Sequence, residues 1–363
     1  MIKKFKNKTV LITGHTGFKG SWLCSWLNLL GARVVGLSID VPTSPSLFSS
    51  IKLEDLIEDY RVDVRNTETI KQIIQDVQPD FVFHLAAQAL VRESYEDPLG
   101  AFSTNAMGTA SILEAIRILD KKVVAVLITS DKVYENVEWL WGYREFDRIG
   151  GKDPYSASKG MAELAIKSYL ECFFSSPESN VRIGIARAGN VIGGGDWARD
   201  RIVPDCIKAW SKNRIVKIRN PKSTRPWQHV LEPLSGYLTL ALNLDENSSN
   251  HGEAYNFGPP ADQNYPVADL IIEMSKHWDN IEWIDASENS DLLQEAGLLK
   301  LNCDKALSHL NWTPNLKFQE TVKMTIEWYK EFYDKDKENI YPFTISQINE
   351  YSQLAKSRNK SWA

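Results

Sequence analysis

The stretch Thr9-Val-Leu-Ile-Thr-Gly-His-Thr-Gly-Phe-Lys-Gly20 decides the fold, because a short apolar run passes directly into a turn with three glycines. The apolar run predicts a buried strand, and residues 20–30 predict an amphipathic helix that Gly31 ends. The glycines let the backbone turn sharply and let a diphosphate approach the N–H groups at the helix N-terminus. Between a strand and a helix this GxxGxxG turn predicts a dinucleotide site, with a purely structural turn as the alternative.

Strand-like and helix-like segments continue to alternate through the first half of the chain. We expect further strands at 34–39, 81–85, 123–128 and 181–185, and helices at 67–77 (capped by Thr67), 105–119 and 154–174. Strands separated by helices of this length imply a parallel sheet with right-handed crossovers. The predicted fold class is α/β: a Rossmann-type doubly wound parallel sheet with a smaller C-terminal substrate-binding α/β region.

The pattern changes after Ala188, where a glycine-rich loop and shorter, proline-containing segments begin. We expect a dinucleotide-binding domain over 1–188 that also includes about 227–259. A substrate-binding domain is expected over about 189–226 and 260–330. Residues 331–363 are polar and charged, and predict a peripheral helix with a loose tail.

Composition narrows the function classes. The chain has 363 residues, 43% hydrophobic and 25% charged, with a formal net charge of −5. This balance gives no reason to expect a nucleic-acid partner, and no apolar stretch is long enough to predict a membrane span. The basic start leads straight into the first strand, which argues against a signal peptide. The scattered Cys24, Cys172, Cys206 and Cys303 match neither a metal site nor a disulfide framework and suggest a reducing cytoplasm.

Asp40 stands at the end of the second predicted strand, 20 residues after Gly20. A carboxylate there accepts hydrogen bonds from the adenosine ribose and repels a 2′-phosphate, so it favours NAD over NADP. A solvated loop acid is the alternative for Asp40, and Arg33 is the alternative that would serve a 2′-phosphate. Asp63 and Val64 follow another short strand, where Asp63 suits the adenine amino group.

Tyr155 and Lys159 are four residues apart, which places a phenol and an ammonium on one helix face. We expect the ammonium to lower the pKa of the phenol and make it a usable base. Ser130 follows the 123–128 strand and suits a hydrogen bond to the reacting hydroxyl, although Tyr-x-x-x-Lys also occurs as a surface pair. The expected cofactor-binding residues are Gly14, Thr16, Gly17, Phe18, Gly20, Asp40, Asp63, Val64, Leu85, Ala86, Ala87, Tyr155 and Lys159.

With these motifs the chain resembles the extended short-chain dehydrogenase/reductase family, and within it the branch that dehydrates CDP-glucose. The matching stretches lie at 13–22, 42–48, 84–88, 129–132, 141–145, 187–197, 225–236 and 256–259, within residues 9 to about 330. The discriminating one is Ser130-Asp131-Lys132. Related dTDP-glucose and GDP-mannose dehydratases are known for Asp-Glu or Ser/Thr-Glu there, and epimerases usually lack the pair.

The resemblance implies an activity on CDP-D-glucose with NAD. Tyr155, assisted by Ser130, would take the 4-hydroxyl proton while hydride leaves C4. Asp131 would then protonate the leaving 6-hydroxyl and Lys132 would remove the C5 proton, yielding CDP-4-keto-6-deoxy-D-glucose. A lysine base must be neutral, so Lys132 as a charged stabiliser of the enolate stays open. For both Asp131 and Lys132, the alternative interpretation is a surface ion pair without a catalytic role.

The resemblance also supplies expected substrate contacts. Asn190 matches the position that meets the substrate diphosphate, Arg225 a phosphate-binding arginine, and Asn256 a third contact by motif. Arg201 is expected to add a phosphate contact, with a salt bridge to Asp200 or Asp205 as the alternative. Asn105 is expected to open the 105–119 helix near the site, and an N-cap role is compatible with that position.

One segment departs from the family pattern. Residues 290–301 keep Glu295-Ala296 but lack the histidines of the family, so cytosine or sugar contacts there are expected to differ. An enzyme for another nucleotide-sugar and a non-catalytic binding protein are the competing interpretations. The helices at 105–119 and 155–174 are expected to pair across a homodimer or homotetramer, as in the family.

Overall fold

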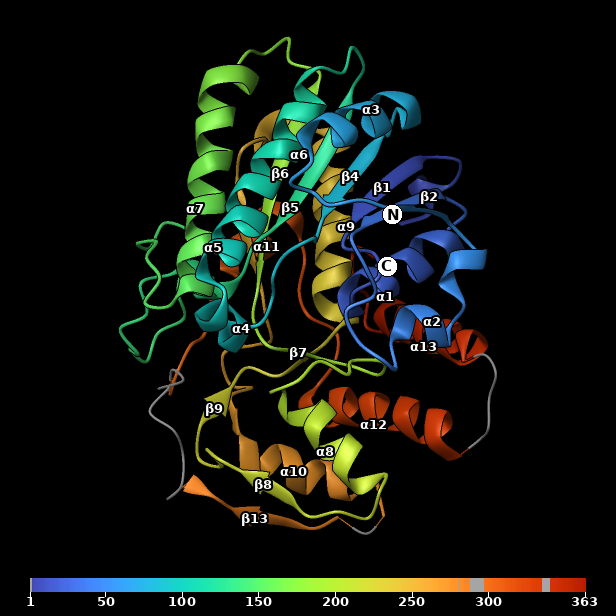
Figure 1. Ribbon diagram of the computed structural model, residues 1–363, viewed down its shortest axis with the longest axis vertical. Helices are drawn as coiled ribbons and strands as arrows, with labels where there is room; N and C mark the ends of the chain where they lie inside the picture. Colours follow the sequence, from blue (N-terminus) through green and yellow to red (C-terminus); the bar gives the residue numbers. More distant parts are fainter. Residues whose placement is uncertain (1, 280, 288–296, 335–339) are drawn as a thin grey trace.

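A computed structural model describes residues 2–279, 281–287, 297–334 and 340–363. Its centre is a seven-stranded parallel sheet in the order β11-β6-β5-β4-β1-β2-β3 (Figure 1). The strands are β1 (Thr9–Thr13), β2 (Arg33–Ser38), β3 (Glu58–Arg61), β4 (Phe81–His84), β5 (Val123–Ile128), β6 (Val181–Ala188) and β11 (Ala254–Phe257). The predicted doubly wound parallel sheet is therefore confirmed.

Helices cover both faces of the sheet (Figure 1). One face carries α3 (Thr67–Val77), α6 (Gly108–Arg117) and α7 (Pro154–Tyr169), and the other carries α1 (Phe18–Leu29) and α9 (Leu231–Glu246). The remaining helices and helical turns are η1 (Ile2–Phe5), α2 (Leu47–Ser50), η2 (Leu53–Asp55), α4 (Val91–Glu96), α5 (Pro98–Phe102), η3 (Ser103–Met107), η4 (Asp131–Val133), η5 (Leu170–Phe174), α8 (Ile202–Trp210), η6 (Ser248–Asn250), α10 (Val267–Ser275), α11 (Asp304–Leu310), α12 (Phe318–Asp334) and α13 (Tyr341–Ser357).

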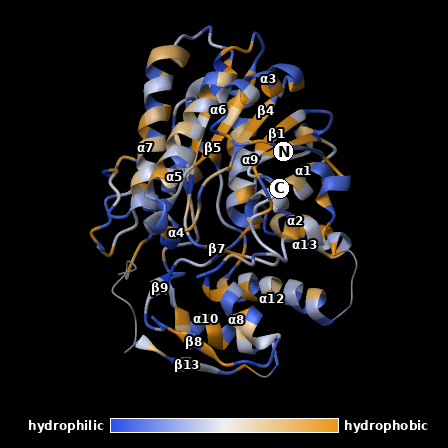
Figure 2. Cartoon of the chain, in the orientation of Figure 1, coloured by the Kyte–Doolittle hydropathy of each residue, from blue (hydrophilic) through white to orange (hydrophobic). Residues whose placement is uncertain are grey.

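The alternation of side chains along the strands builds two separate cores. In β1, Val10 and Ile12 enter the core beneath α1 and α9, whereas Leu11 enters the core beneath α3 and α6. The central strands are correspondingly coloured as hydrophobic in Figure 2. Because both faces are buried, these strands are nearly continuous apolar runs, which explains why the sequence marks them so clearly.

The chain beyond β6 builds smaller sheets below the main one and then returns to it (Figure 1). Three two-stranded sheets pair β7 (Val191–Ile192) with β10 (Gln228–His229), β9 (Thr224–Arg225) with β12 (Tyr265–Pro266), and β8 (Val216–Ile218) with β13 (Trp283–Asp285). After α9, strand β11 pairs with β6 at the edge of the large sheet. The exact division into two domains stays a prediction.

The structure corrects three local expectations. Asn66, not Thr67, caps α3, because its side chain accepts the N–H of Thr69. The helix expected from Asn105 begins with α5 at Pro98, capped by Asp97, and continues through the π-helical turn η3. The expected loose tail is packed in the core: the Trp362 ring is fully buried and stacks on Tyr351.

No helix in the described parts of the chain combines the length and the apolar character needed to cross a membrane.

Candidate active site

The glycine-rich turn lies where the strand order reverses beside β1, with β2 on one side and β4 on the other. Loops after the carboxyl ends of such strands form the ligand crevice of doubly wound sheets. Gly14 follows β1 with a φ of +74°, and a Cβ there would lie 2.7 Å from the N atom of Ala86. The Leu85–Ala87 segment after β4 therefore lies directly against the turn, as expected for small residues beside a cofactor.

The geometry of this turn fits a dinucleotide diphosphate. A Cβ on Gly20 would lie 2.1 Å from the Gly14 carbonyl oxygen, so only glycine permits this close approach of helix and turn. Gly17 is the N-cap of α1, and within the described residues no side chain caps that helix. Its first N–H groups and the positive end of the helix dipole thus suit an anion.

The residues expected at the adenosine end lie in the loops after β2 and β3. Thr16 Oγ1 donates to the carbonyl of Asp40 at 2.6 Å, which holds the loop with the exposed Asp40 beside the glycine-rich turn. The Asp63 carboxylate accepts from three N–H groups of Arg65: the backbone N–H at 2.9 Å, Nε at 2.9 Å and Nη2 at 2.6 Å. These bonds hold the pKa of Asp63 below its usual value. The contact of Asp63 with adenine stays a prediction. Val64 is buried beneath Gly108.

Four of the expected catalytic side chains meet at the end of β5. Ser130, Asp131, Tyr155 and Lys159 are all buried. Ser130 Oγ donates to Asp131 Oδ1 at 3.0 Å and hydrogen-bonds with the Tyr155 phenol. Lys159 Nζ donates to the Ile128 carbonyl at 3.4 Å, which holds the ammonium against the strand end. The side chains required for proton transfer at a hydroxyl are therefore assembled in one place.

The pKa of the phenol corrects the sequence reasoning. Burial raises the pKa of Tyr155 to about 12, and the hydrogen bond with Ser130 opposes that rise. Burial, and then repulsion from Lys19, lowers the pKa of Lys159 to about 8, while Glu163 opposes this. In the protein alone the phenol is therefore not the ready base that we expected, because desolvation outweighs the effects that lower its pKa, which come from Ser130 and Arg201.

Lys132 lies beside this group in the turn η4. Its backbone N–H donates to Ser130 Oγ at 3.2 Å, and its side chain is half-buried. A Cβ on Gly189 would lie 3.2 Å from Asp131 Oδ2, so the glycine leaves room beside the carboxylate. The structure thus brings an acid and an amine to the strand end that carries Ser130.

Asn105 has a different role from the one expected at a helix start. It lies in η3, fully buried, and its Oδ1 accepts the N–H of Gln88 at 2.9 Å. Its Nδ2 donates to the Gln88 carbonyl at 3.0 Å and to Ser158 Oγ at 2.7 Å. Asn105 is not an N-cap, because it lies inside the continuous helical run of α5, η3 and α6. Every polar atom of its amide is used within the protein, which leaves none for a substrate contact.

The expected phosphate-binding side chains lie below the sheet, Arg225 in strand β9 and Asn190 and Arg201 in loops. Arg201 precedes α8, and its guanidinium forms its salt bridge with Asp196 at 2.8 Å rather than with the expected Asp200 or Asp205. Arg201 also interacts electrostatically with Tyr155, which places its guanidinium toward the catalytic group. Arg225 Nη1 donates to the carbonyls of Thr224 at 2.8 Å and Gly297 at 3.4 Å. Asn190 follows β6, and its carbonyl accepts the N–H of Gln228.

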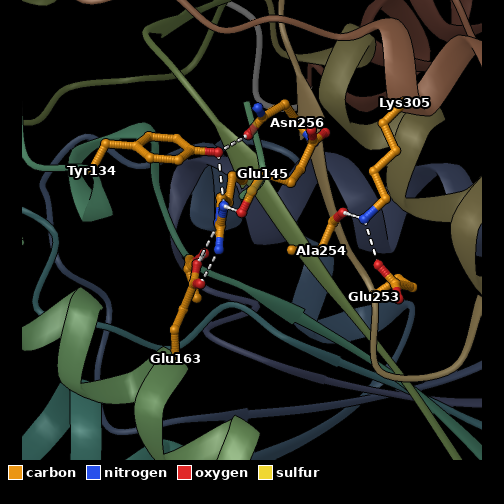
Figure 3. Close-up of polar contacts among 9 residues, drawn as sticks. Tyr134, Glu145, Glu163, Glu253, Ala254, Asn256 and Lys305 are labelled. Atoms are coloured by element: carbon orange, nitrogen blue, oxygen red, sulfur yellow. Dashed lines mark hydrogen bonds and ion pairs between the residues drawn. The ribbon is translucent and has the colours of Figure 1, made fainter. Parts of the chain in front are cut away.

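Asn256 is the clearest correction among the expected substrate contacts. Its side chain is fully buried, and Oδ1 accepts the Tyr134 hydroxyl at 2.8 Å (Figure 3). Nδ2 donates to the carbonyls of Tyr143 and Asn302 at 2.9 and 3.1 Å. These bonds tie β11 to two distant loops. Asn256 therefore supports the architecture and has no atom left for a ligand.

Three other groups near the site escaped the sequence reasoning. Lys19 is half-buried inside the glycine-rich turn; burial and repulsion from Arg201 lower its pKa to about 8. The sequence signal that could have identified Lys19 is its position as a charged residue between two glycines of a dinucleotide-binding turn. Glu163 and Arg187 form a buried ion pair behind Lys159, for which no sequence signal existed beyond helical spacing.

Residues 290–296 of the divergent segment, which include Glu295 and Ala296, lie outside the described part of the chain. The described residues hold no group of three or more His, Cys, Asp or Glu side chains arranged to bind a metal ion.

The glycine-rich turn at the reversal of strand order and the buried group of Ser130, Tyr155 and Lys159 together define the class of extended short-chain dehydrogenases/reductases. Within that class the chain belongs to the GDP-mannose 4,6 dehydratase family, whose model matches residues 11–325. It is 46% identical over 330 residues to a CDP-glucose 4,6-dehydratase from Salmonella typhimurium, covering 90% of this chain and 91% of the relative. A CDP-paratose 2-epimerase from Salmonella typhi is 24% identical, with 88% and 98% covered.

Solved structures share the fold. A dTDP-glucose 4,6-dehydratase from Bacillus anthracis in complex with NAD superposes with a TM-score of 0.72 at 17% identity, covering 89% of this chain and 97% of that one. A UDP-glucuronic acid 4-epimerase from Bacillus cereus, in complex with UDP-glucuronic acid and NAD, reaches 0.75 at 23% identity, covering 90% and 100%.

Proposed function

We propose that the protein is an NAD-dependent nucleotide-sugar 4,6-dehydratase that converts CDP-D-glucose to CDP-4-keto-6-deoxy-D-glucose. The observation that carries the proposal is the placement of Asp131 and Lys132 directly after Ser130, at the strand end that meets Tyr155. A simple epimerase has no need of an added acid and amine there. The 46% identity to a CDP-glucose 4,6-dehydratase spans this site and supports the same nucleotide.

The chain's own residues account for each proton. Tyr155 takes the proton of the 4-hydroxyl through its contact with Ser130, and the resulting ketone acidifies the C5 hydrogen. Asp131 protonates the departing 6-hydroxyl, which leaves as water, while Lys132 removes the C5 proton. If Lys132 instead stays charged and stabilises the enolate, another group is the base. Once hydride has reached C6, C5 takes up a proton again. When held at the glycine-rich turn, the cofactor would supply the redox chemistry: as NAD⁺ it would accept the hydride from C4, and as NADH it would give that hydride back to C6. Each turnover therefore ends with the cofactor in its starting oxidation state.

The buried phenol adds a requirement to this scheme. Because the pKa of Tyr155 is about 12 in the protein alone, little phenolate exists near neutral pH. The positive charge of a nicotinamide ring beside Lys159 would lower it, so base and cofactor act together. We propose NAD rather than NADP because Asp40 stands where a 2′-phosphate would be repelled.

We further propose a cytoplasmic homodimer or homotetramer. Apolar side chains are exposed on neighbouring helical segments: Leu99 on α5, Met107 on η3, and Met161 and Leu164 on α7. Exposed apolar side chains on packed helices favour pairing with a second copy. The free thiols of the four cysteines suit a reducing compartment.

Incubation with CDP-, dTDP-, GDP- and UDP-glucose tests the proposal. We expect the base-induced absorbance of a 4-ketosugar with CDP-glucose at rates well above those with the other three. A faster reaction with another nucleotide would correct the substrate, and the absence of any ketosugar would contradict dehydration.

A further inference from the structure

Glu163 lies on the catalytic helix α7, one turn after Lys159 and two turns after Tyr155. Its side chain is buried, with 3% exposed. Oε1 accepts the Thr129 hydroxyl at 2.6 Å, and Thr129 directly precedes Ser130. A single carboxylate thus contacts the strand end that carries the catalytic serine while standing on the helix that carries the catalytic lysine.

Arg187 on β6 fixes the position of this carboxylate. Its Nε donates to Glu163 Oε1 at 2.7 Å, and its Nη2 bonds to Oε2. Its Nη1 donates to the Tyr134 hydroxyl at 2.7 Å and to the Glu145 carbonyl at 3.0 Å. In Figure 3 the Glu163 carboxylate and the Tyr134 phenol accordingly meet at one guanidinium. Two parallel bonds to a planar cation leave the carboxylate a single orientation.

The charge of Glu163 also acts on the ammonium next to it. From α1, Lys19 repels Lys159, and from α7 Glu163 attracts it. From β4, His84 faces Lys159, but burial lowers the pKa of His84 to about 3 and keeps the imidazole neutral. From β5, the Ile128 carbonyl accepts a hydrogen bond from Lys159. Glu163 is therefore the negative charge that offsets Lys19 at this position.

We propose that Glu163 is a positioning residue, which sets the Ser130 backbone through Thr129 and keeps Lys159 charged. This inference rests on the proposed function for its kinetic consequence, but not for its electrostatic one. The carboxylate touches no reacting atom and acts through Thr129 and Lys159, with Arg187 holding it in place.

Thr129→Val and Thr129→Ser form a matched pair that tests the first part. Valine removes the hydroxyl that Glu163 accepts, whereas serine keeps it, and both leave the ion pair untouched. We expect Thr129→Val to lower kcat by about tenfold or more with KM within about twofold, and Thr129→Ser to retain most of the parent kcat. Equal kcat values in the two variants at similar Tm would overturn the positioning role.

A titration that needs no substrate tests the second part. The ¹³Cε signal of Lys159, assigned with Lys159→Arg, is followed against pH in protein labelled at lysine. The double variant Glu163→Gln/Arg187→Met removes both charges and leaves no orphan ion. We expect its Lys159 midpoint to fall by about half a pH unit or more, and Thr129→Val to leave the midpoint unchanged.

An unchanged midpoint in the folded double variant would overturn the electrostatic part of the proposal. If the double variant fails to fold, Glu163→Gln alone still removes the negative charge, and its Lys159 midpoint is again expected to fall. If the parent turns over none of the nucleotide-sugars, the proposed function fails, and the Lys159 titration still decides the role of Glu163.

Discussion

Asn105 donates a hydrogen bond of 2.7 Å to Ser158, and so joins the π-helical turn to the helix that carries Tyr155 and Lys159. Ser158 in turn donates to the Tyr155 carbonyl at 2.7 Å. The backbone carbonyl of Asn105 accepts a hydrogen bond from the Thr109 hydroxyl. The same hydroxyl is hydrogen-bonded to His84 Nε2 at 3.0 Å. A buried chain of hydrogen bonds thus connects β4 with the catalytic helix.

Replacement of Asn105 by alanine breaks the centre of this chain. It leaves the Gln88 carbonyl and N–H without their partner, so we expect a loss of about 2–4 kcal/mol in the free energy of unfolding. Ser158→Ala is the milder control, because it removes one hydroxyl and costs about 1 kcal/mol. Urea unfolding measures both, and an Asn105→Ala variant as stable as the parent would refute the structural role.

Acid should weaken the fold through its buried histidines. Burial lowers the pKa of His84 and of His229 to about 3 from the ordinary value of 6.5. Below pH 6.5 the unfolded chain therefore binds protons that the folded protein does not, and stability falls as the pH drops toward 3. Each histidine contributes a slope of about 1.4 kcal/mol per pH unit in that window.

Unfolding of the parent and of His84→Gln between pH 7 and 5 measures this slope. We expect the variant to lose less stability across the range than the parent does. Identical pH dependence in the two proteins would show that His84 takes up no extra proton on unfolding.

Lys19 should assist anion binding at a cost to the unliganded protein. Its ammonium repels Lys159 and Arg201, and burial disfavours its charge. We expect Lys19→Met to raise Tm by about 1–3 °C without ligand and to weaken NAD⁺ binding by about tenfold. Calorimetry with NAD⁺ measures the affinity, and the exposed Lys6→Met is the control. Unaltered NAD⁺ affinity in Lys19→Met would contradict a role at the diphosphate.

Sequence reasoning succeeded where a pattern is local. The strand Val123–Ile128 is predicted to the residue, because a strand buried on both faces is an unbroken apolar run. The glycine-rich turn is recognisable because the close approach of Gly20 to the Gly14 carbonyl excludes every other side chain. The association of Ser130 with Tyr155 followed from their placement at a strand end and a helix start.

Prediction from the sequence failed where contacts between distant segments determine the role of a residue. Asn256 is taken up by Tyr134, Tyr143 and Asn302, three partners that nothing in the local sequence connects to it. The pKa of Tyr155 depends on burial, which spacing alone does not reveal. The packing of Trp362 against Tyr351 was hidden because the surrounding residues are mostly polar.

Lys132→Ala separates the two chemical stages of the proposed reaction. If Lys132 is the C5 base, the variant should still transfer hydride from C4 to NAD⁺ but should lose exchange of the C5 proton with solvent deuterium. Absorbance at the reduced-nicotinamide band measures the first stage, and mass spectrometry in D₂O measures the second. Exchange at the parental rate would assign Lys132 to charge stabilisation instead.

The central claim is that one cofactor removes hydride from C4 and returns it to C6 of the same CDP-sugar. Turnover of CDP-[4-²H]glucose, with the product analysed by NMR and mass spectrometry, tests it most directly. We predict that the deuterium appears at C6 of CDP-4-keto-6-deoxy-glucose, with C5 taking its hydrogen from solvent. Deuterium retained at C4, lost to solvent, or found in released reduced cofactor would contradict the account.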